Sequence, residues 1–298
     1  MILLRLTGGL GNQMFQYALG TNLALKNNTE LKIDTTLLAD LKQPHEIYTH
    51  RNLEIDLFDI PLKFATQKEI EYFNGKTYST IPGKVYNKIL WQFRKKNLII
   101  EKERNFHPEI LSLKDNKCLI GGWQSEKYFK DIKNNIRKLY SFHKLLTGKA
   151  LEISKEIQNT NSVCIHVRRG DYVTSPLYNE VLGIQELSYY TKALEILKSQ
   201  RPVDSLFVFS DDINWCKKNL TFTIPANYMD YDTSEKKYIT DMHLMSLCKH
   251  FIISNSTFGW WAAWLGNNKE KAVIAPKNWF KNPAFSSTDI VPDDWLKL

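Results

Sequence analysis

Two adjacent arginines lie in the segment HVRRGDY, residues 166–172, together with an imidazole and a carboxylate. The segment follows VCIHV, an apolar run that predicts a buried strand over 163–167. At the carboxyl end of a parallel strand, Arg168 and Arg169 can make bidentate contacts with a diphosphate. The structural alternative is a surface ion pair between an arginine and Asp171, with a core histidine. We interpret the segment as a diphosphate site.

Two carboxylates, Asp211 and Asp212, follow a second apolar run, SLFVFS at 205–210. The run ends in Ser210, which we count among the predicted donor contacts. One of the two aspartates could accept both N1–H and N2–H₂ of a guanine while the other caps the following helix. A competing idea is a metal site, because Asp230 and Asp232 form a D-x-D pair of the kind that holds a nucleotide diphosphate through Mn²⁺ or Mg²⁺. Since arginines already supply positive charge, we predict no metal.

The glycine loop GGLGNQ, residues 8–13, matches neither common phosphate motif. The dinucleotide fingerprint would need glycine where this chain has Met14, and the sequence GK[ST] of the P-loop is absent. The remaining possibility is a turn whose backbone N–H groups, just before a helix, bind an anion. The side-chain amides of Asn12 and Gln13 could then donate hydrogen bonds to a ligand in a cleft. The alternative is a tight turn with an asparagine helix cap. We predict donor contacts along the loop, at Gly9, Gly11, Asn12 and Gln13.

A second phosphate-binding loop is predicted in SNSTFGWWAAWL, residues 254–265, where polar side chains lie between the end of a strand and the start of a helix. Hydroxyl groups and free helix N–H groups together suit a phosphate. The residues concerned are Asn255, Ser256, Thr257 and Phe258. The three tryptophans that follow are interpreted as core packing.

Helices and strands must position these motifs, and the spacing of apolar residues along the chain predicts where those elements lie. The chain opens with a strand at 2–6, the glycine loop and a helix from Asn12, and a second strand lies at 31–33. From about residue 145 strands and helices alternate, which predicts a parallel, doubly wound sheet. The expected helices are 146–158, 188–199, 233–248 and 257–266, and the expected strands are 163–167, 205–210, 251–254 and 272–275. Helical pieces are expected near 66–74 and 83–95.

Length and composition favour two globular domains. The chain has 298 residues, of which 43% are hydrophobic and 24% charged, so it is neither disordered nor too small for a core. We divide it into an α/β domain at 1–150 and a second at 151–298, with a ligand cleft between them. The four cysteines show no CxxC pair, which favours buried thiols. No apolar run reaches the roughly 20 residues of a membrane span, and the opening run is too short for a signal peptide, so we predict a cytoplasmic protein.

The formal net charge of +8 falls entirely in residues 1–160. Residues 83–97 concentrate it, interleaving aromatic and basic side chains in a pattern that suits an anionic membrane surface or a nucleic acid. A solvated helix with one packed apolar side is the favoured interpretation. The functional interpretation of this run is a peripheral contact with the inner face of the cell membrane. The basic run lies outside the four motifs, and no RNA-binding signature appears, so no nucleic acid is expected.

The motifs GGLGNQMFQYA, HVRRGDYV, FSDD and CKHFIISNSTFGWWAAWL, in this order, resemble those of the bacterial α-1,2-fucosyltransferases of glycosyltransferase family 11. The resemblance runs from residue 6 to about 280 and is thinnest over 40–115, where we expect acceptor specificity. It implies an α/β fold of two facing Rossmann-like domains (GT-B-like) with parallel sheets and a donor cleft between them. It also implies GDP-β-L-fucose as donor co-substrate, a galactose-terminated glycan such as an O-antigen precursor as acceptor, and no cofactor or obligatory metal.

The resemblance also implies roles for single residues. Arg168 looks like the donor-pyrophosphate arginine, and His166 and Asp211 resemble the guanine-contacting pair. Ser256, Thr257 and Phe258 resemble the turn that grips the diphosphate. Asn12 matches the asparagine that faces the diphosphate from the other domain. Arg168, Asn12 and Asp171 are the predicted catalytic residues.

The general base stays open. The related α1,6-enzymes carry a glutamate ten residues after the motif histidine, where this chain has Pro176. Asp171, Glu180 and Asp34 are the candidates, and Asp171 could instead pair with Arg169. Competing functions are a non-enzymatic nucleotide or RNA binder, a two-carboxylate hydrolase, and a fucosyltransferase of another linkage.

Overall fold

The computed structural model describes residues 1–38, 51–74, 95–231, 237–285 and 288–298. It divides the chain into two compact units, Met1–Leu139 and Tyr140–Leu298. The division lies earlier than the boundary expected after residue 150. The reason is helix α5 (Gly148–Asn159), whose buried side packs against α10 (Lys237–Leu247) in the second unit.

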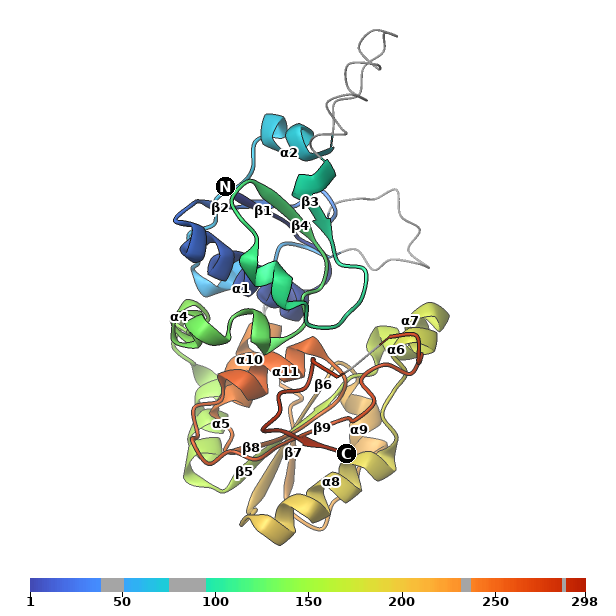
Figure 1. Cartoon of the computed structure of the whole chain (residues 1–298). Coiled ribbons are helices and arrows are strands. Elements are labelled where there is room, and N and C mark those ends of the chain that lie inside the picture. The colour runs from blue at the N-terminus through green and yellow to red at the C-terminus, as the bar shows by residue number, and fades with distance from the viewer. Residues whose placement is uncertain (39–50, 75–94, 232–236, 286–287) are drawn as a thin grey trace, which may run out of the picture. The chain divides into compact units, whose positions relative to one another are not determined.

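The first unit is built on a four-stranded parallel sheet (Figure 1). Its strands, in spatial order, are β2 (Leu31–Asp34), β1 (Ile2–Arg5), β4 (Lys117–Ile120) and β3 (Leu98–Ile100). Its helices are α1 (Leu10–Asn27), α2 (Gln67–Asn74) and α4 (Lys133–Leu139), with short 3₁₀ turns between them. Helix α1 packs along β1, and the expected strand and helix pieces at 2–6, 31–33 and 66–74 are confirmed within one or two residues.

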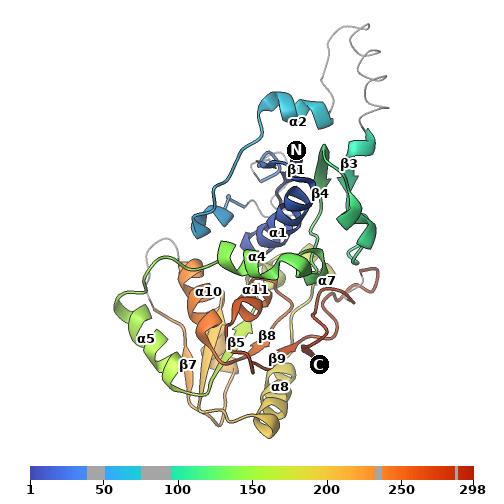
Figure 2. The ribbon, with the colours of Figure 1, turned by 60° about the vertical axis from the view of Figure 1, so that its left-hand side comes forward.

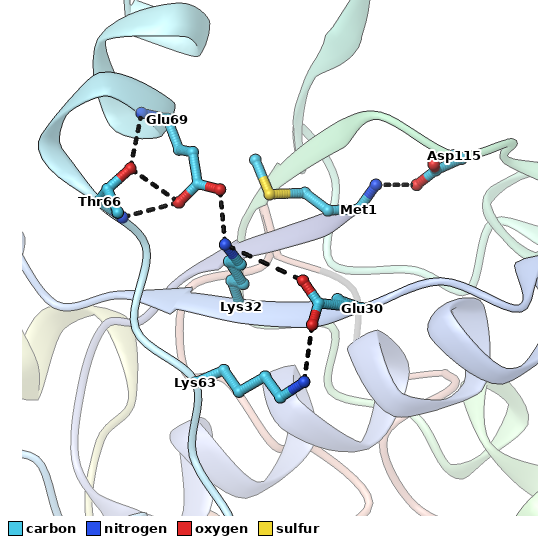
Figure 3. A network of polar contacts seen from close by, with 7 residues as sticks. All are labelled: Met1, Glu30, Lys32, Lys63, Thr66, Glu69 and Asp115. Atoms are coloured by element: carbon cyan, nitrogen blue, oxygen red, sulfur yellow. Dashed lines mark hydrogen bonds and ion pairs between the residues drawn. The ribbon is translucent and has the colours of Figure 1, made fainter.

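A network of charged side chains ties α2 to the edge strand β2 (Figure 3). Nζ of Lys32 lies 2.6 Å from Oε1 of Glu69, and Nζ of Lys63 lies 2.7 Å from Oε1 of Glu30. Glu69 also accepts from the backbone N–H of Thr66, at 2.8 Å, which forms a capping box at the start of α2.

The second unit is built on a six-stranded sheet whose described ladders are all parallel (Figure 2). Its strands, in spatial order, are β10 (Leu296–Lys297), β9 (Val273–Ala275), β8 (His250–Ile253), β5 (Ser162–Val167), β6 (Ser205–Ser210) and β7 (Ala226–Tyr228). Its remaining helices are α6 (Gly170–Thr174), α7 (Pro176–Val181), α8 (Leu187–Gln200), α9 (Ile213–Asn219) and α11 (Thr257–Leu265). The predicted α/β class with parallel sheets is confirmed.

Successive side chains of β5 point to opposite faces of the sheet, and each face packs against different helices. Val163, Ile165 and Val167 join the apolar cluster that α8 and α9 complete. His166, on the opposite face, lies against Gly259 of α11. Burial on both faces explains why this strand is apolar along almost its whole length.

Two predicted elements fall partly or wholly outside the described residues. These are the helix at 83–95, within the basic run 83–97, and the start of the helix expected at 233–248. None of the helices in the described residues has both the length and the hydrophobicity that crossing a lipid bilayer requires.

Candidate active site

Three of the predicted motifs meet at one edge of the second sheet. Strands β8, β5 and β6 are neighbours and run parallel, so their carboxyl ends lie together. The loops that leave these ends carry Arg168, Asp211 and Ser256. In open parallel sheets this edge is where ligands bind.

Arg168 is held between two carboxylates. Its Nη2 donates to Oδ1 of Asp171 at 2.6 Å, and its Nη1 lies 3.0 Å from Oδ2 of Asp211. The guanidinium also stands 5.5 Å from the ring centre of Tyr172. Burial opposes the charged form, but the two carboxylates outweigh it and raise the pKa of Arg168. The side chain keeps 25% exposure, so a positive group of fixed orientation is open to an anionic ligand.

Arg169 has different partners from those expected. Its Nε donates to Oδ2 of Asp212 at 3.3 Å, and its guanidinium lies 3.6 Å from the ring centre of Trp215. The alternative pairing of Arg169 with Asp171 is therefore wrong, since the carboxylate of Asp171 is directed to Arg168. The backbone of Arg169 belongs to the site, because its N–H donates to Oδ1 of Asp211 at 2.9 Å.

Gly170 makes room for this arrangement. A Cβ built on it would stand 2.4 Å from Oδ2 of Asp211, closer than any real contact. The glycine in the RRGD sequence is needed so that Asp211 can reach both arginines.

The two aspartates after β6 divide their tasks. Asp212 is the N-cap of α9, accepting from the N–H of Trp215 at 3.2 Å, as expected for one of the pair. Ser210 supports the turn by accepting from the N–H of Asp212 at 2.9 Å. Asp211 caps no helix and instead contacts the arginine loop, with its side chain 26% exposed. A guanine contact by Asp211 would add to bonds that it already makes.

His166 is buried beneath the loop as a neutral ring. Its Nδ1 lies 3.0 Å from Oγ of Ser254, and its ring centre is 5.9 Å from that of Phe258. Burial, with a smaller contribution from Arg168, lowers its pKa to about 3. Gly259 permits the close approach of α11, because a Cβ there would be 2.7 Å from Nδ1.

The third loop begins α11. Ser256 is its N-cap residue and Thr257 and Phe258 form its first turn, where N–H groups without helical partners point away from the helix. Asn255 is turned inward, however. Its Nδ2 donates to the carbonyls of Leu182, at 2.8 Å, and Trp279, at 3.0 Å, so its side chain ties loops together, and a donor contact by it stays a prediction.

In the first unit, the glycine loop is occupied by the protein's own groups. The N–H of Leu10 donates to Oε2 of Glu54 at 2.5 Å, which starts α1 two residues earlier than expected. Gln13 is fully buried, with its Nε2 on the carbonyls of Gly8 and Asn52 and its Oε1 on the N–H groups of Glu54 and Ile55. Its amide has no capacity left for a ligand unless these bonds break.

Asn12 is placed differently. It is half-buried near the start of α1, and its Oδ1 accepts from Nε2 of Gln124 at 2.9 Å. Gly9 is the N-cap residue of this helix and Gly11 lies buried in its first turn.

Sequence reasoning missed Gln124 and Glu54, and also Glu101, whose carboxylate accepts from the N–H groups of Gly122 at 2.6 Å and Trp123 at 3.1 Å. Each of the three acts through a contact between segments far apart in the chain.

The three candidates for the general base differ in the contacts that their carboxylates make. Asp34 is buried and holds Nε of Arg5 at 2.7 Å, so it has a structural role. Asp171 holds Arg168, and protonating it would break that ion pair. Glu180 lies on α7 and is exposed.

The D-x-D pair gives little support to a metal site. Asp230 is an exposed residue whose Oδ2 lies 2.5 Å from Nζ of Lys217, and this hydrogen bond lowers its pKa. Asp232 lies outside the described residues. Within the residues that the structure describes, no three His, Cys, Asp or Glu side chains are grouped as metal ligands would be.

Comparison with known proteins gives a full-length match. Residues 1–298 match the family model described as glycosyl transferase family 11. An α-1,2-colitosyltransferase of Escherichia coli is 34% identical, over 100% of this chain and 99% of its own. The O-antigen biosynthesis glycosyltransferase WbnK of Escherichia coli is 32% identical, over 98% and 99%. A galactoside 2-α-L-fucosyltransferase of Caenorhabditis elegans is 28% identical, over 64% of this chain and 56% of its own.

Proposed function

The chain belongs to glycosyl transferase family 11, and on that basis we propose that it transfers L-fucose from GDP-β-L-fucose to the 2-OH of a terminal galactose. The observation that carries the proposal is the arginine loop after β5. There a partly exposed guanidinium is fixed by two carboxylates at the carboxyl edge of a parallel sheet. The acceptor is a galactose-terminated oligosaccharide or polysaccharide precursor.

The chemistry of the step explains why such a group is needed. The bond from the sugar C1 to the phosphate oxygen breaks, GDP departs, and a bond from the galactose 2-OH oxygen to C1 forms with inversion. Negative charge grows on the departing diphosphate, so donors directed at it stabilise the transition state more than the ground state. In the proposal Arg168 and Asn12 are these donors.

The acceptor hydroxyl must also lose its proton to a base. Because Asp34 and Asp171 are held by arginines, the exposed Glu180 is the carboxylate that the contacts favour among the three candidates. Asp171 then serves to orient Arg168.

The remaining polar groups suit the nucleotide. In the proposal Asp211 and His166 lie at the guanine, and Ser256, Thr257 and the first turn of α11 face the diphosphate. The proposal includes no cofactor, because GDP-fucose is itself a substrate. Arginine, amide and backbone N–H donors stabilise the negative charge of the leaving group in this proposal.

A colitosyl donor is the second candidate, favoured by the 34% identity to the α-1,2-colitosyltransferase over full length. Colitose is L-fucose without its 3-OH, so the chemistry at C1 and the leaving group are the same. The two donors therefore differ only in contacts to one hydroxyl group.

For the location we propose the cytoplasm, with the run 83–97 as the place of a peripheral contact with the anionic inner face of the cell membrane, which is the functional alternative to a solvated, packed helix. The aromatic and basic side chains of that run support the contact. Sedimentation of the protein with anionic but not with neutral vesicles, abolished by replacing the lysines of the run with glutamine, tests it.

The experiment for the activity itself measures GDP release and product linkage. Purified protein is incubated with GDP-fucose or GDP-colitose, with and without a β-galactoside such as lactose. We expect GDP release that depends on the galactoside, and a product with an α1,2 linkage by NMR. Release without acceptor would point to a hydrolase, and GDP binding without release to a nucleotide-binding protein.

A further inference from the structure

The hydroxyl of Tyr172, on α6, joins two loops of the second unit. It donates to the backbone carbonyl of Asn255 at 3.1 Å, although 83 positions separate the two residues in the chain. The contact follows from the sheet, because β5 and β8 are parallel neighbours and the two residues lie in the segments that leave their carboxyl ends. Since Asn255 directly precedes Ser256, the N-cap residue of α11, the hydroxyl ties the arginine loop to the start of that helix.

Both partners of this hydrogen bond are fixed. Tyr172 is buried, and burial raises its pKa, so the hydroxyl keeps the proton that it donates to the carbonyl. Nδ2 of Asn255 donates to three backbone carbonyls, those of Leu182 at 2.8 Å, Trp279 at 3.0 Å and Gly183 at 3.3 Å. Because only the amide nitrogen can donate to them, the orientation of this amide is set, and the carbonyl of Asn255 is a fixed point for the hydroxyl.

The ring of Tyr172 lies against Arg168. The guanidinium of Arg168 stands 5.5 Å from the ring centre, within the range of a cation–π contact. The backbone of the tyrosine is held as well, since Nδ2 of Asn179, on α7, donates to its carbonyl at 3.0 Å. One side chain therefore contacts the arginine with its ring and Asn255 with its hydroxyl.

We propose that Tyr172 is a positioning residue whose hydroxyl fixes Arg168 relative to the first turn of α11. The inference rests on the proposed function, in which Arg168 and that turn contact the diphosphate of the donor. Without the hydroxyl the arginine loop shifts relative to the helix, and Arg168 is misplaced for the negative charge that grows as GDP leaves. The effect acts on the transition state and therefore on kcat.

Tyr172→Phe tests the proposal, because the change keeps the ring against Arg168 and removes only the hydroxyl. We expect kcat for transfer to fall at least fivefold, with little change in the KM for the galactoside. The matched control is Tyr228→Phe, on the edge strand β7, which removes another hydroxyl that donates to a backbone carbonyl, that of Leu220. The control should keep wild-type kinetics, and urea unfolding of both variants shows whether they are folded under the assay conditions.

A double-mutant cycle separates positioning from a general structural effect. In the background of Arg168→Ala, Tyr172→Phe should cause no further loss of kcat, because the hydroxyl acts through Arg168. Wild-type transfer together with a Tyr172→Phe variant that keeps more than a fifth of wild-type kcat, or with additive losses in the cycle, would overturn the inference. A loss of kcat that accompanies loss of the folded state would overturn it too, since Tyr172 would then have only a structural role. A wild type without transfer from either sugar donor would instead overturn the proposed function, and the inference with it.

Discussion

Arg168 and Asp211 form an ion pair across the carboxyl ends of two neighbouring strands, with Nη1 of Arg168 3.0 Å from Oδ2 of Asp211. The other terminal nitrogen of the guanidinium donates to Asp171 at 2.6 Å. Both carboxylates thus set the orientation of the arginine before any ligand arrives. Such preorganisation is what makes a charged donor effective toward developing negative charge.

Replacing Arg168 is expected to remove most of the activity. The loss of one charged transition-state contact is worth roughly 2.7–4 kcal/mol, or about 10²–10³ in rate. Arg168→Ala should therefore keep well under a tenth of the wild-type kcat for GDP release with a galactoside. Arg168→Lys should be nearly as poor, because an ammonium group cannot contact Asp171, Asp211 and a phosphate with the fork of a guanidinium.

Arg169→Ala is the matched comparison at the next position. Arg169 stacks on Trp215 and pairs with Asp212, so its loss should lower the free energy of unfolding as well as activity. Urea unfolding of both variants separates the two effects. A folded Arg168→Ala protein with more than a tenth of wild-type turnover would remove Arg168 from the mechanism.

Activity is expected to persist in excess EDTA. The groups that meet the leaving diphosphate in the proposal are arginine, amide and backbone donors, which need no metal. Asp230, the described half of the D-x-D pair, contacts Lys217 and should tolerate Asp230→Asn. Loss of transfer in EDTA with recovery on adding Mn²⁺, together with an inactive Asp230→Asn variant, would transfer the leaving-group role to the D-x-D pair.

His166 makes the stability of the fold depend on pH. Burial, and to a lesser degree Arg168, lowers its pKa to about 3, so the folded state keeps the ring neutral where the unfolded chain binds a proton. The stabilisation is complete above the ordinary histidine pKa of about 6.5 and is lost as the pH falls toward 3. Each proton changes the free energy of unfolding by roughly 1.4 kcal/mol per pH unit in that window.

The measurement is urea unfolding between pH 7 and pH 4. His166→Asn keeps a nitrogen or oxygen near Ser254 but cannot titrate, so its unfolding free energy should fall less steeply with acid than that of the wild type. His143→Asn, at an exposed histidine, should keep the wild-type slope. Parallel curves for the wild type and His166→Asn would show that the ring is not held neutral in the fold.

The motif loops of the second unit were accessible to sequence reasoning because each follows a strand with a strong apolar pattern. Strands at 163–167, 205–210 and 251–254 lie within one residue of β5, β6 and β8. The rule that parallel strands present their carboxyl ends at one edge then brings Arg168, Asp211 and Ser256 together.

The partners of those side chains could not be predicted in the same way. Asp211 could have paired with a base, a helix or an arginine, and only the register of β5 against β6 selects Arg168. In the first unit, strands β3 and β4 are three and four residues long, too short for a clear alternation. The contacts that depend on them, from Glu101 to the Trp123 turn and from Gln124 to Asn12, therefore had no sequence signal.

The last prediction concerns the identity of the nucleotide, which depends on Asp211. Its two oxygens already accept from the N–H of Arg169 and from Arg168, but the side chain is 26% exposed and each carboxylate oxygen has a further lone pair. A guanine offers N1–H and N2–H₂ to such an edge, uracil offers no such pair, and adenine offers one misplaced amino group. A desolvated acceptor without its donors costs about 1–3 kcal/mol, so calorimetry should show GDP binding at least tenfold more tightly than UDP or ADP.

Variants assign that preference to one of the two aspartates. Asp211→Asn should reduce the advantage of GDP over UDP to less than threefold, because an amide cannot accept two guanine donors while also serving the arginine loop. Asp212→Ala should keep the preference and instead lower the free energy of unfolding by about 1 kcal/mol, the usual cost of losing an N-cap. Arg168→Ala should weaken the binding of GDP, UDP and ADP alike, since in the proposal Arg168 contacts the diphosphate that all three share. Equal binding of UDP and GDP by the wild type would remove guanine from the site, and with it the main physical support for a GDP-sugar donor.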